Sequence, residues 1–222
     1  MTGFRTFIDG AFRSFNAQGI TRLIIDLRGN PGGDSLFSDV MVSWFATRPY
    51  QFFSSFQIRV SADAVAANRN RIAQDPVAAG AISQRYADLY ATAAPGDIIA
   101  LTMPDSQPNK GERFTGKVYA LINRQTYSNA VAVAATLQDY GFGTILGEPT
   151  ADMATAFGAM EQFTLPATGI TVGFPKAHIV RPNGDNRARG VTPDIAIPFP
   201  IVETPDDTVL QQAARIAAAD TP

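Results

Sequence analysis

Apolar residues along the first part of the chain follow helical spacing, then strand spacing, then helical spacing again. An amphipathic helix that ends at Gly19 is predicted near the start; its apolar positions are Phe4, Phe7, Ile8, Ala11, Phe12 and Phe15. The short apolar run Leu23 to Leu27 is typical of a strand that is covered on both faces. Asp34 or Ser35 can cap the next helix, whose apolar residues are Leu36, Val40, Met41, Trp44 and Phe45.

The remainder of the chain continues this alternation. Strand character at Phe52 to Val60 precedes an Ala-rich helical region over 62–92 with a break near Pro76. Residues 94–116 are rich in Pro, Gly, Asp, Asn and Lys, which predicts a long surface loop. The later predicted elements are a strand at Lys117 to Asn123, a helix from Ser128 to Tyr140, a strand at Gly143 to Leu146, a hairpin of Ala159 to Leu165 with Ile170 to Phe174, and a helix from Asp206 to Ala219. This order predicts a mixed α/β layer fold.

Length and composition narrow the class of protein. A chain of 222 residues can bury one sizeable core, so 1–222 is expected to form a single domain. A net charge of −2 without a Lys/Arg cluster argues against a nucleic-acid partner. No apolar run reaches the roughly 20 residues that a transmembrane helix needs. Cysteine is absent, which excludes disulfides, thiolate metal sites and a cysteine nucleophile.

Candidate chemistry lies at two junctions between a strand and a helix. Gly32 and Gly33 follow the first strand, and without Cβ atoms they can turn backbone N–H groups toward a ligand oxygen. Ser128 follows a later strand and opens a helix, so its hydroxyl is expected beyond the carboxyl end of the sheet. The alternatives are a plain turn for the glycines and a helix N-cap for Ser128. A hydroxyl opposite free N–H groups would suit acyl transfer.

Four segments in the same order resemble the tail-specific (C-terminal-processing) serine proteases, and in particular their tricorn-core-like branch. They are Asp26–Gly33 (D-L-R-x-N-x-G-G), Thr126–Ala130 with Leu137–Gly141, Gly147–Thr150 (G-E-x-T) and Gly190–Ile195 (G-V-x-P-D-I). The resemblance implies a crotonase/ClpP-like spiral fold, a peptide or protein substrate, and neither metal nor organic cofactor. It places the nucleophile at Ser128 and an oxyanion hole at the N–H groups of Gly33 or Gly32 and of Asn129. We expect Ser128 Oγ within about 6 Å of a glycine N.

The general base of this family has no counterpart in the sequence. Met153 aligns with the lysine of the Ser–Lys branch, and a thioether cannot take a proton from a hydroxyl. The tricorn-like branch uses an upstream His and a Glu, but no His precedes His178, and Arg187 stands near the expected Glu. Loss of the base from such a hydrolase costs on the order of 10⁶ in kcat. We therefore expect an N-terminal cap region, which family members carry, to belong to the complete enzyme.

Two residues could substitute as a base, and two could orient one. His178 and Lys176 are the candidate bases, whereas Asp152 and Asp185 could only orient a base, and Asp152 could instead cap a turn. The segment Phe174 to Arg181 is predicted to run along a strand near a sheet edge. Alternation along that strand would put His178 on the same face as Lys176 and Val180. If Ile179 faces the core, His178 faces solvent and makes no hydrogen bond to Ser128.

Three functions fit these observations. The first is a serine peptidase core that acts through an acyl-enzyme on Ser128. The second is a non-catalytic module of the same fold that binds a ligand or peptide, since apolar side chains could line a pocket as well as a core: Phe52, Phe53, Phe56, Phe142 and Phe157. The third is a crotonase-like acyl-CoA enzyme, but this sequence has no evident basic patch to bind the nucleotide phosphates of such a substrate. A bacterial periplasmic or other extracytoplasmic location is expected, although no signal peptide is visible, and the oligomeric state is left open.

Overall fold

The computed structural model describes residues 2–200 and 205–220, and confirms the mixed α/β class. The chain groups into two compact units. Unit 1 comprises Met1–Ser54, Met103–Thr155 and Arg181–Pro222, and unit 2 comprises Ser55–Thr102 and Ala156–Val180. Within the described ranges, no helix is both long enough and apolar enough to cross a membrane.

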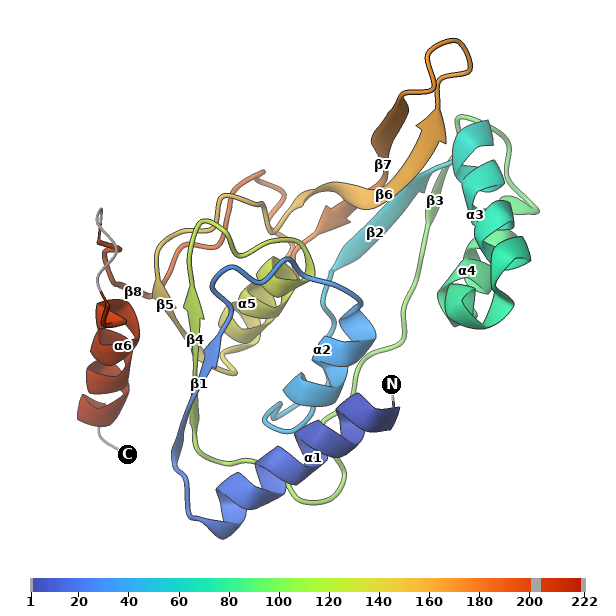
Figure 1. The fold of residues 1–222 in the computed structure, drawn as a ribbon. Helices are drawn as coiled ribbons and strands as arrows, with labels where there is room; N and C mark the ends of the chain where they lie inside the picture. Colours follow the sequence, from blue (N-terminus) through green and yellow to red (C-terminus); the bar gives the residue numbers. More distant parts are fainter. Residues whose placement is uncertain (1, 201–204, 221–222) are drawn as a thin grey trace. The chain divides into compact units, whose positions relative to one another are not determined.

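Unit 1 is built on a parallel sheet of four strands (Figure 1). The strands are β1 (Arg22–Asp26), β4 (Lys117–Ile122), β5 (Thr144–Gly147) and β8 (Ile195–Ala196), in the order β1-β4-β5-β8. The two inner strands, β4 and β5, are mostly buried and read as continuous apolar runs, as expected for strands covered on both faces. Because all neighbours are parallel, their carboxyl ends open on the same edge of the sheet.

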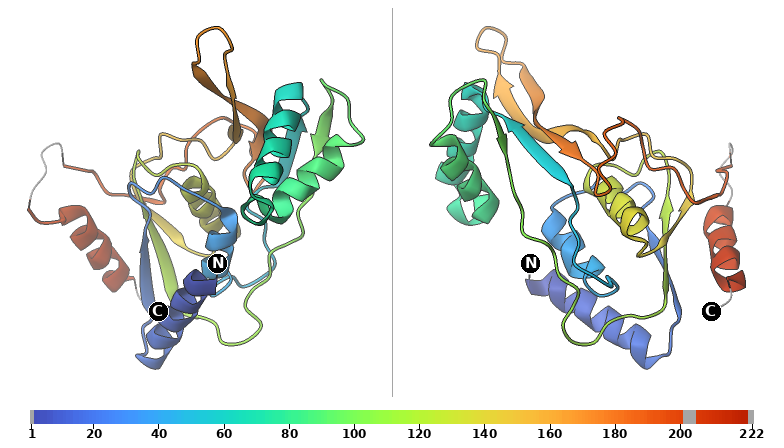
Figure 2. Two further views of the ribbon diagram at one scale, coloured as in Figure 1. Left: turned by 45° about the vertical axis from the view of Figure 1, so that its right-hand side comes forward. Right: turned by 180° about the vertical axis from the view of Figure 1, so that it is seen from behind.

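Helices cover both faces of this sheet. They are α1 (Thr2–Ala17), α2 (Ser35–Val42), α5 (Asn129–Tyr140) and α6 (Thr208–Ala219). Side chains alternate along β4, so Val118, Ala120 and Ile122 share one core with residues of α1, α2 and α5. Tyr119 and Leu121 point the other way and pack with α6. Figure 2 shows α5 and α6 on opposite sides of the sheet.

The first two helices agree with the apolar pattern, with small differences. α1 runs to Ala17, and Gly19 follows it with a φ of +65°. Asp34 rather than Ser35 caps α2, because its side chain accepts a hydrogen bond from the N–H of Leu36. Residues 43–45 form a turn after α2, yet Trp44 and Phe45 are buried in the same core.

Unit 2 is an antiparallel sheet with two helices packed against it. The strands are β2 (Ser55–Arg59), β3 (Ile98–Ala100), β6 (Ala156–Thr164) and β7 (Thr171–Val180), in the order β3-β2-β7-β6. The helices are α3 (Ala62–Gln74) and α4 (Pro76–Tyr90), so the predicted break at Pro76 is confirmed. The segment 94–116 contains β3, which pairs with β2, and is therefore not loop throughout.

The prediction that His178 lies near a sheet edge is wrong. β7 continues to Val180 and pairs with β2 on one side and β6 on the other, which makes it an interior strand. The alternation of buried and exposed side chains along β7 is also interrupted, since the neighbours Lys176 and Ala177 are both buried. The interruption lies opposite Ala159 of β6, whose φ is +54°. Lys176 and His178 therefore do not share a face.

The chain passes from unit 1 into unit 2 twice, and each time the residues of unit 1 before and after the excursion are hydrogen-bonded to each other. Tyr50 and Ser106 flank the first excursion and exchange two backbone hydrogen bonds of 3.0 and 2.8 Å. Thr155 and Arg181 flank the second, where the N–H of Arg181 donates to Thr155 Oγ1 at 3.1 Å. Each excursion thus begins and ends at neighbouring points of unit 1.

Candidate active site

The site predicted from sequence lies at the carboxyl ends of three adjacent strands of unit 1. The glycine segment 27–34 follows β1, the segment 123–128 follows β4, and the turn 148–152 follows β5. Because β4 lies between β1 and β5, the loop that carries Ser128 is flanked by the other two. Open α/β sheets place their ligands at this edge.

Hydrogen bonds tie the glycine segment to the loop before Ser128. Thr126 Oγ1 donates to the carbonyl of Leu27 at 2.9 Å, and the N–H of Tyr127 donates to the carbonyl of Asn30 at 3.0 Å. The side chain of Asn123 accepts from the N–H of Gly29 at 3.2 Å. These hydrogen bonds fix the two segments against each other.

Gly32 stands directly against Ser128 and Asn129. Its φ of +87° favours glycine, and a Cβ added there would lie 2.7 Å from both Ser128 Cβ and Asn129 N. Any side chain at this position would therefore collide with the start of α5. The missing Cβ keeps open the space in front of the N–H of Asn129.

The backbone N–H groups of the two glycines are not equivalent. The N–H of Gly32 donates to Asn30 Oδ1 at 2.8 Å, so it is already occupied. A Cβ added to Gly33 would meet nothing within 4 Å, and Asn129 is the first residue of α5, where N–H groups lack a partner within the helix. No described residue accepts a hydrogen bond from the N–H of Gly33 or of Asn129. Gly33 and Asn129 are thus the better pair of donors.

Ser128 does not behave as an ordinary helix cap. Its side chain makes no capping hydrogen bond, and the residue is exposed. Its φ of 53° and ψ of −124° lie in a region that non-glycine residues rarely adopt and that occurs mainly at functional sites. Ser128 therefore holds the N-cap position of α5 through its backbone, but its side chain does not cap the helix, and no described residue hydrogen-bonds Ser128 Oγ.

Asp152 reaches the same residue from the other side. Its Oδ2 accepts a hydrogen bond from the backbone N–H of Ser128 at 2.6 Å. Thr150 Oγ1 donates to the carbonyl of Asp152 at 2.7 Å and fixes the turn after β5. Sequence reasoning considered Asp152 as a turn cap or as an orienting group, and missed this contact because it depends on β5 lying beside β4.

The remaining candidates of unit 1 do not approach Ser128 through any observed contact. Asp185 pairs with Arg187 at 2.9 Å and with Arg189 at 2.8 Å, and the hydrogen bonds from Arg187 hold the pKa of Asp185 well below its usual range. Met153, which aligns with the family lysine, is 45% exposed. That its side chain points toward Ser128 stays a prediction.

His178 and Lys176 belong to unit 2, where each is engaged. The ring of His178 lies 4.9 Å from the ring of Phe157. Lys176 is buried, with Nζ 2.5 Å from Glu161 Oε1 and 4.0 Å from the ring of Tyr86, and burial lowers the pKa of its ammonium. Lys176, a candidate base in the sequence analysis, is thus paired with Glu161 inside unit 2. The predicted hairpin strand ended at Phe174, so the sequence pattern did not place Lys176 opposite Glu161.

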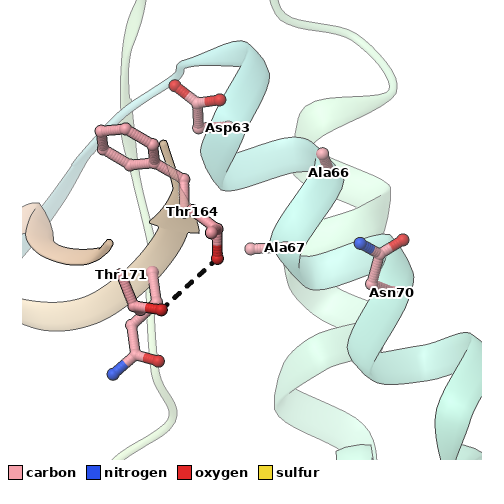
Figure 3. A pocket seen from close by; sticks show the side chains of 8 residues that line it. Asp63, Ala66, Ala67, Asn70, Thr164 and Thr171 are labelled. Carbon is pink, nitrogen blue, oxygen red and sulfur yellow. Dashed lines mark hydrogen bonds between the residues drawn. The ribbon is translucent and has the colours of Figure 1, made fainter. Parts of the chain in front are cut away.

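Unit 2 also contains a cavity of about 420 Å³. Figure 3 shows Asp63, Ala66 and Asn70 of α3 on one side of it, facing Thr164 and Thr171 of the β6–β7 hairpin. The two threonine hydroxyls are 3.4 Å apart. None of the predicted site residues lines this cavity. In the described ranges, no three His, Cys, Asp or Glu side chains gather in a way that could hold a metal ion.

The sequence matches the profile of peptidase family S41 over residues 2–197, and the chain therefore belongs to this family. The resemblance to tail-specific proteases inferred from the motifs is thus confirmed at the level of the family. No curated protein matches the chain by sequence.

Several solved structures share the fold. Mature CPAF complexed with lactacystin superposes with a TM-score of 0.64 at 21% identity, over 89% of this chain and 42% of that one. The photosystem II D1 C-terminal processing protease gives 0.51 at 20% identity, over 99% and 45%. A lipoprotein from Streptococcus agalactiae gives 0.51 at 13%, over 98% and 61%. The chain thus spans less than half of CPAF and of the D1 protease.

Proposed function

We propose that unit 1 carries the centre of a serine-type peptide hydrolase. Ser128 would attack the carbonyl carbon of a peptide bond and form an acyl-enzyme, which water then hydrolyses. The N–H groups of Gly33 and Asn129 would stabilise the oxyanion, since both are unoccupied and Gly32 leaves space in front of Asn129. Membership of peptidase family S41 supports this proposal.

The observation that carries the proposal is the conformation of Ser128. A serine at a strand-to-helix junction with a strained backbone, an exposed side chain and no capping bond is poised to present its hydroxyl to a ligand. Nucleophilic serines of other hydrolases occupy a comparable sharp turn between a strand and a helix. The proposed substrates are peptides or proteins, and an extracytoplasmic location belongs to the same proposal.

A fluorophosphonate probe tests this function directly. We expect the probe to phosphonylate Ser128, with the added mass on the peptide that contains it, and Ser128→Ala to abolish the label. Ser35→Ala is the matched control, because Ser35 also begins a helix after a strand-to-helix turn. Labelling that is absent from the native chain, or that persists in Ser128→Ala, would refute the proposal.

Met153 tests which branch of the family the centre resembles. If Met153 occupies the lysine position, Met153→Lys would supply an amine that can take the proton of Ser128, and labelling should become faster. Met153→Gln is the control, since it adds a polar group of similar length without a base. No gain in a folded Met153→Lys variant would show that the site is not arranged for a Ser–Lys pair.

A binding module of the same fold is the second candidate. The methionine at the lysine position favours it, because a centre without a base hydrolyses poorly. In that case the native chain would bind an extended peptide, as measured by calorimetry or fluorescence polarisation, yet leave it uncleaved and remain unlabelled by the probe.

A further inference from the structure

The unfavourable backbone conformation of Ser128 must be stabilised by contacts with other residues. Its φ and ψ fall where a side chain is unfavourable, and such conformations persist only when the surroundings impose them. Two neighbours do so in unit 1. Gly32 presses against Ser128 Cβ from the side of β1, and Asp152 accepts the backbone N–H of Ser128 from the side of β5.

The turn that bears Asp152 is anchored by the segment before β8. Thr150 Oγ1 donates to the carbonyl of Asp152 at 2.7 Å and accepts the N–H of Val191 at 2.9 Å. A Cβ on Gly190 would lie 2.1 Å from the carbonyl oxygen of Thr150, so only glycine permits this approach. The Asp152 carboxylate therefore binds the N–H of Ser128 from a turn that is itself held by the segment before β8.

This contact decides which N–H groups remain for a substrate. Several serine hydrolases use the N–H of the nucleophile itself in the oxyanion hole. Here that N–H is taken by Asp152 at 2.6 Å, whereas the N–H groups of Asn129 and Gly33 have no partner among the described residues. An oxyanion must then form on the side of Ser128 that faces the glycine segment, away from the negative charge of Asp152.

We propose that Asp152 is a positioning residue: its carboxylate oxygen holds Ser128 in the strained conformation and directs the substrate carbonyl to Asn129 and Gly33. The inference rests on the proposed function of Ser128. The acceptor oxygen performs the positioning, so its negative charge is not required. An amide oxygen at the same place would serve as well.

Hydrogen exchange tests the contact without reference to activity. In Asp152→Ala, the amide of Ser128 should lose at least about tenfold of its protection, while Asp152→Asn retains most of it. The amide of Val131, which donates to the carbonyl of Ser128 at 2.9 Å, reports whether the start of α5 stays intact. Equal protection of Ser128 in the native chain and Asp152→Ala would overturn the proposal.

Fluorophosphonate labelling tests the consequence. We expect Asp152→Ala to slow the labelling of Ser128 on the order of ten- to a hundredfold, and Asp152→Asn to stay within about threefold of the native rate. Asp194→Ala is the matched control, because Asp194 also accepts a backbone N–H, that of Ile145 at 2.8 Å. It should cost stability without slowing the label to the same degree.

The outcomes separate this inference from the function on which it rests. If Asp152→Asn is as slow as Asp152→Ala, the charge is required, and Asp152 is a base or an electrostatic group instead. If Asp152→Ala labels at the native rate, the positioning role is refuted while the proposed function stands. If the native chain is not labelled, the proposed function fails, and a loss of protection in Asp152→Ala would then make Asp152 a purely structural residue.

Discussion

Ser128 combines an unfavourable backbone with a side chain that makes no capping bond. Conformations of this kind cost on the order of 1–3 kcal/mol at a non-glycine residue. Glycine adopts positive φ without that cost, so a chain selected for stability alone would favour glycine at this position. A serine at this position fits a functional constraint on the hydroxyl.

Substitutions at Ser128 should separate stability from chemistry. Ser128→Gly removes the backbone strain, and Ser128→Ala keeps it, so Ser128→Gly should be more stable than Ser128→Ala by about 1 kcal/mol. Both should lose fluorophosphonate labelling. Urea denaturation followed by circular dichroism measures the difference, and an alanine variant at least as stable as the glycine variant would contradict this account.

Gly32 should tolerate no side chain. Gly32→Ala places a Cβ 2.7 Å from Asn129 N, so it should destabilise the chain by about 2 kcal/mol or more and abolish the labelling of Ser128. Gly19→Ala is the matched control, since Gly19 has a φ of +65° but open space around its Cβ position. It should cost about 1 kcal/mol and leave labelling unchanged. Equal effects in both variants would show that strain, and not the collision, matters.

At the level of elements, α6 is tied to the end of β1 through Arg28. The guanidinium contacts Asp26 and Asp207, each with a shortest distance of 2.6 Å, and Asp207 also caps α6 by accepting the N–H of Leu210. The hydrogen bonds from Arg28, and next that from Leu210, lower the pKa of Asp207 from 3.8 to about 2. The ion pair is partly exposed, so its contribution is below about 1 kcal/mol.

This ion pair predicts a small acid sensitivity. The pKa of Asp207 is lower in the folded chain than in the unfolded chain. Its contribution to the free energy of unfolding is therefore fully present above about pH 3.8 and is lost as the pH falls toward about 2. Asp207→Asn keeps the cap but does not titrate, so its unfolding free energy should fall less than that of the native chain between pH 4 and pH 2. Parallel curves for the two proteins in urea denaturation would contradict the prediction.

Local pattern was sufficient to predict most elements and the two junctions of the site. The apolar run before Asp26 and that before Asn123 each predicted a strand, and each ends where the candidate residues begin. The contact of Asp152 with Ser128 could not be predicted, because it depends on the order of strands in the sheet. The interior place of β7 was missed for a similar reason, since its partner β2 lies more than a hundred residues earlier.

At the scale of the whole chain, each unit contains a buried ion pair of its own: Arg181 with Asp139 in unit 1, and Lys176 with Glu161 in unit 2. Glu161 is 4% exposed and contacts both Lys176 and Arg71. Buried pairs add little to stability compared with apolar packing, but removal of one partner leaves an uncompensated charge. Unit 2 should therefore be more sensitive than unit 1 to a change at Glu161.

Glu161→Gln should destabilise unit 2 by about 3 kcal/mol, because Lys176 then lacks a counter-charge. Amides of β6 and β7 should exchange faster, while those of β4 and α5 keep their native rates. The double variant Glu161→Gln with Lys176→Met should recover part of the loss, since the unpaired ammonium is gone. A double variant as unstable as the sum of the single ones would argue against this electrostatic origin.

The paired flanks of the two excursions from unit 1 suggest modularity. Tyr50 is bonded to Ser106 and Thr155 to Arg181, so residues 55–102 and 156–180 behave as insertions whose ends already meet. Evolution could then lengthen, trim or exchange unit 2 while the three loops around Ser128 remain as they are. A chain in which short Gly-Ser linkers replace both insertions should keep the parallel sheet, measurable as native-like chemical shifts for β4 and α5.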